Sequence, residues 1–280
     1  MGGTAVVLGG GGAVGIGWQA GLLTGLAEGG CDLSGADLVV GTSAGALVGA
    51  FLARGADPSA ALRSLARMAP AMTADQLAEG SRALLAAMAD AGQGPEALRS
   101  IGRLAARQPA LLDEAAFLGL AADLDGQPWP GNYRCTATAV DTGKVVVWTP
   151  ESRVALHRAV AASCAAPLMF PPVTIDGRRY MDGGVLSHLN VRAAVGAERI
   201  LALSCFPLDQ PLAAFQTVSQ EIAELHASGT ALLAMEPPPR GVRAGCGRPG
   251  HDGPGAGRRG VRPRTRTGGP REGRRDGVVG

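Results

Sequence analysis

The 280-residue sequence has no long hydrophobic runs and few aromatic residues. Its longest apolar runs fall far short of the roughly 20 residues that a transmembrane helix needs. Aromatic residues make up 4% of the chain, against 46% for all hydrophobic residues. The sequence therefore predicts a core built from Ala, Val and Leu. A chain of this length allows one large α/β domain or two small ones.

The cysteines and the N-terminus indicate a protein of a reducing compartment. The five cysteines are odd in number and show no CxxC spacing: Cys31, Cys135, Cys164, Cys205 and Cys246. This pattern argues against a disulfide framework and against a zinc site. Met1 is followed by glycines and a strand-like segment, so we expect no secretion signal and a cytoplasmic location.

Charge is divided unevenly along the chain. Residues 237–280 hold eleven Arg and three acidic residues, a net charge of +8, which leaves −6 for residues 1–236 of a total of +2. The segment is mostly Gly, Pro and Arg, a composition that cannot bury a core. We expect one folded domain over residues 1–236 and a disordered tail over residues 237–280. A nucleic acid or an anionic membrane suits such a basic tail, but we favour a frame-shifted or read-through end.

The segment Gly41-Thr42-Ser43-Ala44-Gly45 lies between two apolar runs, residues 37–40 and 46–53. The first run is short and β-branched and predicts a strand, whereas the second is rich in Ala and Leu and predicts a helix. A serine between two glycines at such a junction is the nucleophile-elbow pattern. The turn requires small neighbours, and the serine Oγ lies at the positive end of the helix dipole. An ordinary Gly/Ser turn is the alternative.

A second glycine-rich loop, residues 9–15, follows a predicted strand at residues 4–8 and precedes a helix expected to begin near Gly17. Strand, glycine loop and helix together aim backbone N–H groups at an anion. The loop could cradle a pyrophosphate, supply an oxyanion hole or form a tight turn.

Gly10, Gly12 and Gly15 also satisfy the dinucleotide fingerprint GxGxxG. A dinucleotide site needs an acidic residue at the end of the next strand to hold a ribose. Asp32 falls in a glycine-rich turn, and Asp37 begins that strand instead of ending it. The nucleotide interpretation is therefore the weaker one.

Residues 54–125 are predicted to be helical throughout, with helix starts at residues 57–59, 73–75 and 112–114. Residues 92–95 form a break in this block. Its apolar side chains recur at helical spacing. The helices either pack against the sheet, which we favour, or form a lid whose apolar face meets lipid.

The following residues alternate between strands and helices. Residues 133–140 and 145–148 predict a β-hairpin, and a second hairpin turn at residues 175–178 leads into Asp182-Gly183-Gly184. The remaining predicted elements are helices at residues 153–166, 189–195 and 213–235 and a strand at residues 199–205.

Three segments together resemble the patatin-like phospholipases, which are bacterial and eukaryotic lipid acyl hydrolases: residues 10–15, 41–45 and 182–184. Residues 162–167 with 170–173, and residues 136–143, are also similar to stretches of this family. The resemblance covers about residues 4–210. Each motif alone is weak, but their order and spacing together are specific.

The resemblance implies a three-layer α/β/α fold with a mostly parallel central sheet and a helical insertion. It also implies that Ser43 is the nucleophile and Asp182 the base of a Ser-Asp dyad without a catalytic histidine. Backbone N–H groups around Gly11 and Gly12 would form the oxyanion hole. The family usually has Arg or Lys where this chain has Val14, which puts a positive charge near the loop in doubt.

The implied activity is hydrolysis of carboxylic esters in phospholipids or lysophospholipids, with peripheral membrane contact. A serine hydroxyl is a poor nucleophile until a base takes its proton. Asp has a pKa of about 3.9 in water, and a dry pocket makes it more basic. Gly183 and Gly184 have no side chains to block the approach of Asp182 to Ser43.

Other assignments stay open at this point. Among the four histidines, His188 is the one that could complete an ordinary Ser-His-Asp triad, but we interpret it as a loop residue. No cluster of ligating side chains suggests a metal, and the sequence predicts no cofactor, no specific nucleic-acid partner and no particular oligomeric state. The rival functions are a dinucleotide-binding oxidoreductase and a catalytically silent lipid-binding protein.

Overall fold

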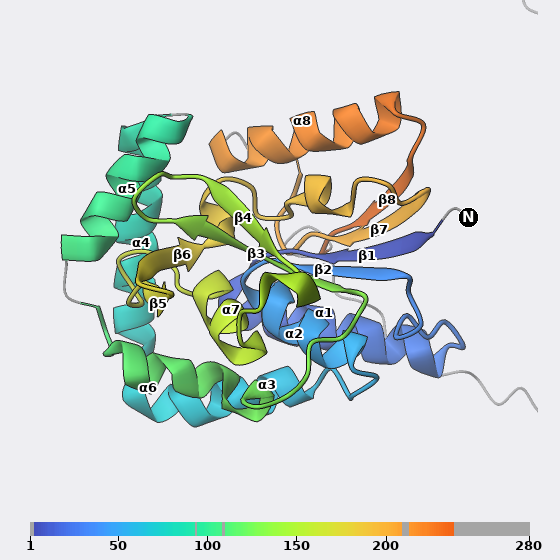
Figure 1. Ribbon diagram of the computed structural model, residues 1–280, viewed down its shortest axis with the longest axis horizontal. Helices are drawn as coiled ribbons and strands as arrows, with labels where there is room; N and C mark the ends of the chain where they lie inside the picture. Colours follow the sequence, from blue (N-terminus) through green and yellow to red (C-terminus); the bar gives the residue numbers. More distant parts are fainter. Residues whose placement is uncertain (1–2, 93, 108–109, 209–212, 238–280) are drawn as a thin grey trace, which may run out of the picture. The chain divides into compact units, whose positions relative to one another are not determined.

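The computed structural model describes residues 3–92, 94–107, 110–208 and 213–237. An eight-stranded sheet in the order β5-β6-β3-β2-β1-β7-β8, with β4 also paired to β3, runs through these residues (Figure 1). The strands are β1 Thr4–Leu8, β2 Leu38–Gly41, β3 Tyr133–Ala139, β4 Val145–Trp148, β5 Val173–Ile175, β6 Arg178–Asp182, β7 Arg199–Leu203 and β8 Ala231–Met235. The predicted tail lies, apart from Pro237, outside the described residues.

Helices cover both faces of the sheet. The α-helices are α1 Gly12–Glu28, α2 Ala44–Ala53, α3 Ala60–Met68, α4 Ala74–Ala91, α5 Pro95–Arg107, α6 Glu114–Leu118, α7 Leu156–Ser163 and α8 Ala213–Ala227. Short 3₁₀ turns are η1 Ala69–Ala71, η2 Gly119–Leu124, η3 Pro150–Ser152, η4 Gly183–Val185 and η5 Val191–Ala194. None of the helices in the described ranges has the length and hydropathy that crossing a membrane requires.

The alternating side chains of β1 fill two separate cores. Val6 and Leu8 join the core beneath α1, α2 and α7, while Ala5 and Val7 face the core that contains buried residues of α8 and η5. Successive strand residues point to opposite faces, so an almost wholly apolar β1 requires cover on both sides. This is the predicted three-layer α/β/α architecture with a mostly parallel sheet (Figure 1).

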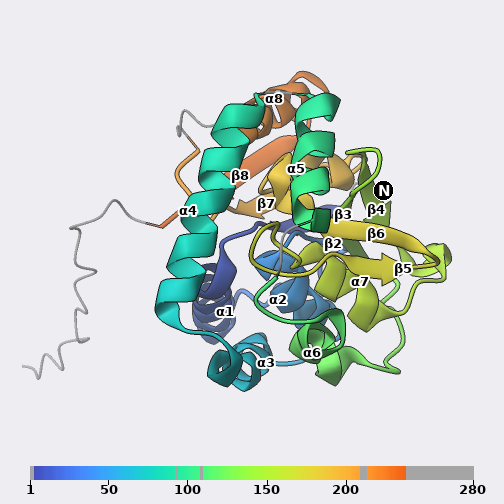
Figure 2. The same ribbon diagram turned by 90° about the vertical axis from the view of Figure 1, so that its left-hand side faces the viewer.

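The predicted helical block, residues 54–125, is indeed mostly helical, and its predicted starts are confirmed. Thr73 caps α4 through a capping box with Gln76, and Asp113 caps α6. The helices α4 and α5 pack against each other (Figure 2). Residues of α5 share a small core with Met181 of β6, so at least α5 packs against the sheet region, as we favoured.

Several helix predictions were wrong in their bounds or type; the helix predicted over residues 153–166, for instance, is α7 and spans only Leu156–Ser163. The first helix begins at Gly12, not near Gly17. At residues 189–195 there is only the 3₁₀ turn η5. The helix predicted over residues 213–235 ends at Ala227, because Gly229 with φ of 84° turns the chain into β8. Strand β8 then pairs in parallel with β7, and Leu232, which had been assigned to a helical stripe, is half-buried in this strand.

Strand register brings several loops to one edge of the sheet. Leu8 of β1 is level with Gly41 of β2 and with Leu203 of β7, so the loops after these parallel strands leave the sheet together. Asp182 ends the antiparallel strand β6 and pairs with Ala137. Because Cys135 is level with Gly41, residue 137 lies beyond the end of β2, and Asp182 reaches the same edge.

Candidate active site

Ser43 occupies a strained turn between β2 and α2. Its backbone has φ of 55° and ψ of −122°, a conformation that a residue with a side chain adopts only when its surroundings enforce it. Gly41 and Gly45 permit this turn because they pack against backbone: an added Cβ would lie 2.5 Å from the Ala46 Cα at Gly41 and 2.1 Å from the Leu8 oxygen at Gly45. The sequence-predicted elbow is therefore present, with its serine half-buried.

Two side chains from the end of α7 hold the Ser43 backbone. The Ser43 N–H donates to the Ser163 Oγ at 2.9 Å, and the Cys164 Sγ donates to the Ser43 carbonyl oxygen at 3.1 Å. Sequence reasoning gave these residues no role, although they lie in residues 162–167, which had been noted for their resemblance. Ser163 gives the Ser43 N–H an acceptor, and Cys164 adds a donor to the Ser43 carbonyl oxygen, which also accepts from the Ala46 N–H at 2.8 Å.

The structure brings Asp182 to Ser43. The Asp182 side chain is only 6% exposed. Burial raises the pKa of Asp182 to about 6, although hydrogen bonds from the Ser43 hydroxyl and the Gly184 N–H oppose this rise. The Gly184 N–H lies 2.7 Å from the Asp182 Oδ1. A carboxylate in a low-dielectric site gains proton affinity, so Asp182 is a much better proton acceptor than an exposed aspartate.

Gly183 allows the segment after β6 to approach β3 closely. An added Cβ at Gly183 would lie 2.6 Å from the Thr136 Oγ1 and 2.9 Å from the Thr136 carbonyl oxygen. At Gly184 an added Cβ would lie 3.0 Å from the Asp182 Oδ1. Larger residues would therefore push the Asp182 carboxylate away from the position that it occupies.

The glycine loop after β1 lies directly beside Ser43. A Cβ built on Gly10 would be 3.3 Å from the Ser43 Cβ and 3.8 Å from its Oγ. The Gly10 N–H donates to the His188 carbonyl oxygen at 2.7 Å, and the Gly15 N–H donates to the Gly11 oxygen at 2.9 Å. These two N–H groups are thus engaged within the protein.

Gly11 and Gly12 of the same loop do not use their N–H groups in this way within the part of the chain that the structure describes. Their N–H groups make no hydrogen bond to any residue that the structure describes. Gly11 is half-buried and Gly12 is exposed at the first turn of α1, where helix N–H groups lack intrahelical partners. They are the loop amides that an oxygen anion could reach.

The sequence model of a family described as patatin-like phospholipase matches residues 6–195. The chain belongs to the patatin-like phospholipase family. Both Ser43 and Asp182 lie within the matched residues, as does the glycine loop. Among curated proteins, no sequence matches this chain.

Two solved structures that match this patatin-like protein do so at low similarity. VipD from Legionella pneumophila is 16% identical, with 81% of this chain and 55% of that chain covered and a TM-score of 0.40. The type III effector protein ExoU is 17% identical, with 86% and 49% covered and a TM-score of 0.37. The chain spans about half the length of these two proteins.

The patatin-like protein does not place an acidic residue where a dinucleotide site would need one. Asp37 accepts a hydrogen bond from the Thr4 N–H at 2.7 Å, at the start of β1 and β2. The glycine loop follows the opposite end of β1. Together with the family match, this separation removes the basis for the oxidoreductase interpretation.

His188 lies close to the glycine loop but pairs with a different serine. Its Nε2 lies 2.8 Å from the Ser204 Oγ, and the Ser204 hydroxyl donates to the Phe206 carbonyl oxygen at 2.5 Å. Since the Ser204 proton is used there, we assign the Nε2 hydrogen to His188. Burial lowers the pKa of His188 to about 4, so the ring is neutral near pH 7.

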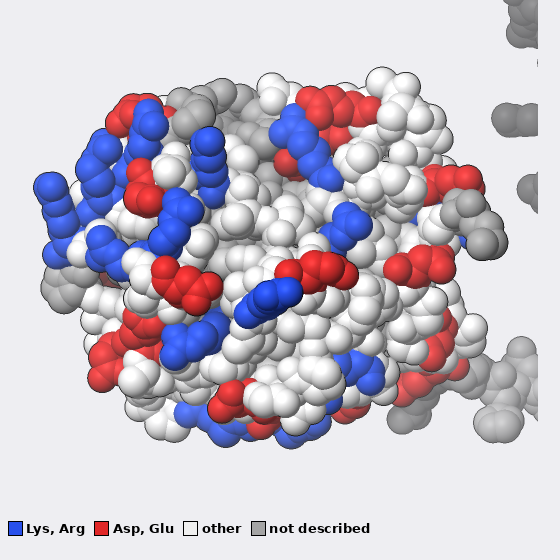
Figure 3. Space-filling model, viewed as in Figure 1, with Lys and Arg blue, Asp and Glu red and all other residues white. Residues whose placement is uncertain are grey.

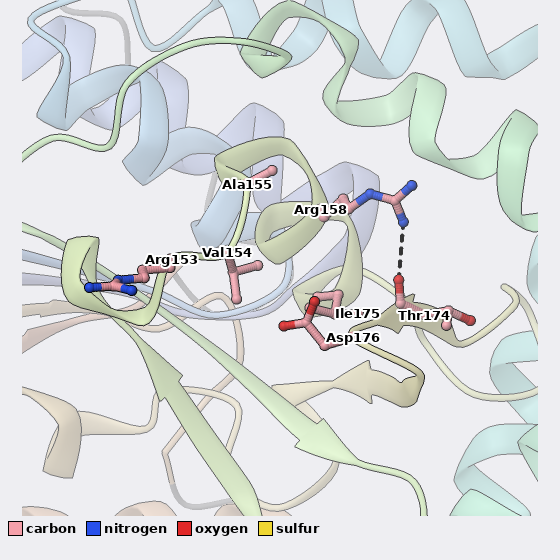
Figure 4. A pocket seen from close by; sticks show the side chains of 7 residues that line it. All are labelled: Arg153, Val154, Ala155, Arg158, Thr174, Ile175 and Asp176. Atoms are coloured by element: carbon pink, nitrogen blue, oxygen red, sulfur yellow. Dashed lines mark hydrogen bonds between the residues drawn. The ribbon is translucent and has the colours of Figure 1, made fainter.

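A surface pocket of about 300 Å³ lies elsewhere, beside the N-terminal end of α7. Figure 4 labels its lining residues Arg153, Val154, Ala155, Arg158, Thr174, Ile175 and Asp176. Ser163, which contacts the nucleophile elbow, ends the same eight-residue helix, and a helix of that length spans about 12 Å. The pocket is therefore separate from the Ser43 site.

Basic side chains gather on the side of the molecule where α5 and the β5–β6 hairpin lie, with acidic side chains between them (Figure 3). Many of these charges are paired. Glu96 accepts hydrogen bonds from Arg99 and Arg103, and Asp141 pairs with Arg178 at 3.1 Å. Exposed pairs of this kind contribute little to stability.

Proposed function

We propose that this protein is a serine lipid acyl hydrolase that cleaves carboxylic ester bonds of phospholipids or lysophospholipids. Ser43 is the nucleophile and Asp182 the general base. The observation that carries the proposal is the buried Asp182 carboxylate, whose pKa is raised to about 6 and which interacts with the Ser43 hydroxyl. Membership of the patatin-like phospholipase family supports a lipid ester as the substrate.

The first half-reaction forms an acyl-enzyme. As the Ser43 Oγ bonds to the ester carbonyl carbon, Asp182 takes the hydroxyl proton. The C–O bond to the lipid alcohol then breaks, and the proton passes from Asp182 to the departing alkoxide oxygen. The acyl chain remains on Ser43 as an ester.

The second half-reaction releases the fatty acid. Asp182 removes a proton from a water molecule, whose oxygen bonds to the acyl carbon. The bond to the Ser43 Oγ breaks, and the serine recovers a proton from Asp182. One buried carboxylate thus serves as base and acid in turn, which a pKa of about 6 permits near neutral pH.

The N–H groups of Gly11 and Gly12 stabilise the oxyanion of both tetrahedral intermediates. Their lack of partners among the described residues supports this role, and the N-terminus of α1 adds the positive end of a helix dipole. A preorganised oxyanion donor contributes about 10²- to 10³-fold to kcat.

Contact with a lipid surface is the finer part of the proposal. Val14, in the first turn of α1, is 82% exposed. This exposed apolar side chain beside the glycine loop is available for contact with a micelle or bilayer. Val14→Ser should slow hydrolysis of phospholipid vesicles while leaving a soluble p-nitrophenyl ester unaffected.

A substrate panel tests the function. Wild type should hydrolyse p-nitrophenyl butyrate and release fatty acid from at least one phospholipid or lysophospholipid in mixed micelles, with Ser43→Ala as the blank. Equal rates for wild type and Ser43→Ala would contradict the proposal. A folded wild type that binds the vesicles and hydrolyses nothing would instead indicate a silent lipid-binding protein.

A further inference from the structure

One buried amide contacts both segments that carry the proposed dyad. Asn190 is 4% exposed, and its Nδ2 lies within hydrogen-bonding distance of four oxygens. They are the Thr42 Oγ1 at 3.2 Å, the Thr136 Oγ1 at 3.4 Å, the Gly183 carbonyl oxygen at 3.2 Å and the Ser187 carbonyl oxygen at 2.6 Å. Two of the four are carbonyl oxygens, which can only accept, so the amide nitrogen must face them.

The acceptors belong to neighbours of the reacting residues. Thr42 directly precedes Ser43, and Gly183 directly follows Asp182. The Thr42 and Thr136 hydroxyls are also 2.8 Å apart, so β2, β3 and the loop after β6 meet at one buried polar cluster. Asn190 connects the nucleophile segment to the base segment without contacting either reacting side chain.

Hydrogen bonds that lead to helix α8 hold Asn190 in place. Its backbone is left-handed, with φ of 51°, a conformation that asparagine tolerates. Its N–H donates to the Ser187 Oγ at 3.0 Å, and that hydroxyl donates to the Glu221 Oε2 of α8 at 2.8 Å. Glu221 is 2% exposed and also accepts the Val191 N–H at 3.2 Å. The catalytic loops are thereby connected to α8.

We propose that Asn190 is a positioning residue that sets the distance between the Ser43 hydroxyl and the Asp182 carboxylate. The inference rests on the proposed function, since it concerns the geometry of that dyad. An amide has no proton to transfer near neutral pH, so its effect is purely geometric. A misplacement of about 1 Å between reacting groups lowers turnover by up to about 100-fold.

The test uses Asn190→Gly, which keeps the left-handed backbone accessible and removes the amide. We expect kcat on p-nitrophenyl butyrate to fall about 10- to 100-fold, with KM within about threefold of wild type. Asn132→Ala is the matched control, because the Asn132 Nδ2 also holds one carbonyl oxygen, that of Ala36 at 2.8 Å. Asn132 precedes β3, at the opposite end of the sheet, so kcat should be unchanged.

A second pair of variants tests the proposal even if Asn190→Gly does not fold. Thr42→Ser keeps the hydroxyl that accepts from Asn190, whereas Thr42→Val replaces it with a methyl group of similar size. Thr42→Ser should keep kcat within about threefold of wild type, and Thr42→Val should lose about tenfold or more. Equal kcat values for the two folded variants would overturn the proposal.

The outcomes separate this inference from the proposed function. Wild-type turnover that depends on Ser43, together with an unchanged kcat in folded Asn190→Gly, overturns the positioning role alone. Wild-type turnover that does not depend on Ser43 overturns both. A fall in kcat in Asn190→Gly that Asn132→Ala does not reproduce supports Asn190 as the residue that aligns the dyad.

Discussion

Two serines at the same edge of the sheet, Ser43 and Ser204, each lie beside a potential base. Ser43 follows β2 and lies against Asp182, while Ser204 follows β7 and hydrogen-bonds to His188. By residue type alone, the second pair looks more like a conventional hydrolase, because histidine is the commonest catalytic base. The structures of the two pairs favour the first.

The direction of the serine proton separates the pairs. The Ser43 hydroxyl interacts with the Asp182 carboxylate, which, when it is ionised, can only accept a hydrogen bond, whereas the Ser204 hydroxyl donates to the Phe206 carbonyl oxygen and accepts from His188. Ser43 is half-buried on a strained turn beside the glycine loop, but Ser204 is fully buried. A serine next to a base is thus insufficient for nucleophilic catalysis. The substrate must also reach the serine, and the serine proton must be directed at the base.

Removal of each serine should produce the largest difference between the pairs. Ser43→Ala should lower kcat on p-nitrophenyl butyrate by about 10⁴-fold or more, because no other hydroxyl replaces the nucleophile. Ser204→Ala should keep most of the activity. Steady-state assays of both purified variants check this, with thermal unfolding as the control for folding. Comparable losses in the two variants would break the comparison.

Removal of each base should give a similar but smaller contrast. Asp182→Asn keeps an oxygen that can accept from Gly184 but cannot take the Ser43 proton, and we expect a loss of about 10³- to 10⁴-fold in kcat. His188→Ala should retain most activity. If His188→Ala were as inactive as Ser43→Ala, the dyad would be assigned incorrectly.

The acid limb of the pH profile should identify the base without any mutation. Asp182 with a pKa of about 6 predicts that kcat/KM falls about tenfold per pH unit below pH 6. His188 as the base would place that limb near pH 4. Burial raises the pKa of the neighbouring Cys135 thiol to about 12 and also raises that of Cys164, so neither thiol titrates in this range.

The same pKa values predict a smaller effect on stability, of opposite sign for the two bases. The pKa of Asp182 rises from 3.8 to about 6 on folding, so the folded state binds more protons between these values and loses stability as pH rises. Asp182→Asn should therefore stabilise the protein at pH 7 by up to about 3 kcal/mol, an advantage that disappears below about pH 4.

Urea unfolding of wild type and Asp182→Asn across this pH range measures the difference. The pKa of His188 falls from 6.5 to about 4, so the folded state binds fewer protons and His188 makes wild type more stable as pH rises through that window. A stability difference between wild type and Asp182→Asn that did not vary with pH would mean that the pKa of Asp182 is the same in the folded and the unfolded protein.

Local chemistry allowed the sequence to predict much of the sheet edge where Ser43 and Asp182 lie. The turn from β2 into α2 was placed correctly because Gly41 and Gly45 are the residues that such a tight turn demands. The Asp182 segment was located by its hairpin and its two glycines. These patterns are local in the chain, so they can be recognised without knowledge of the fold.

Contacts through space were not predictable in the same way. Ser163 and Asn190 are common polar residues whose sequence spacing says nothing about which strands they will bridge. The boundary between α8 and β8 was missed because Leu232 continued a helical stripe, although Gly229 marked the turn. Residues 231–235 form a strand because they pair in parallel with β7, which is a tertiary contact.

Mapping a fluorophosphonate adduct determines whether Ser43 is the activated nucleophile. The folded wild-type protein would be labelled, digested and analysed by mass spectrometry. The account predicts one adduct, on the peptide that contains Ser43, and a sharp fall in its labelling rate in Asp182→Asn. An adduct on Ser204, or labelling of Ser43 that proceeds equally fast without Asp182, would contradict it.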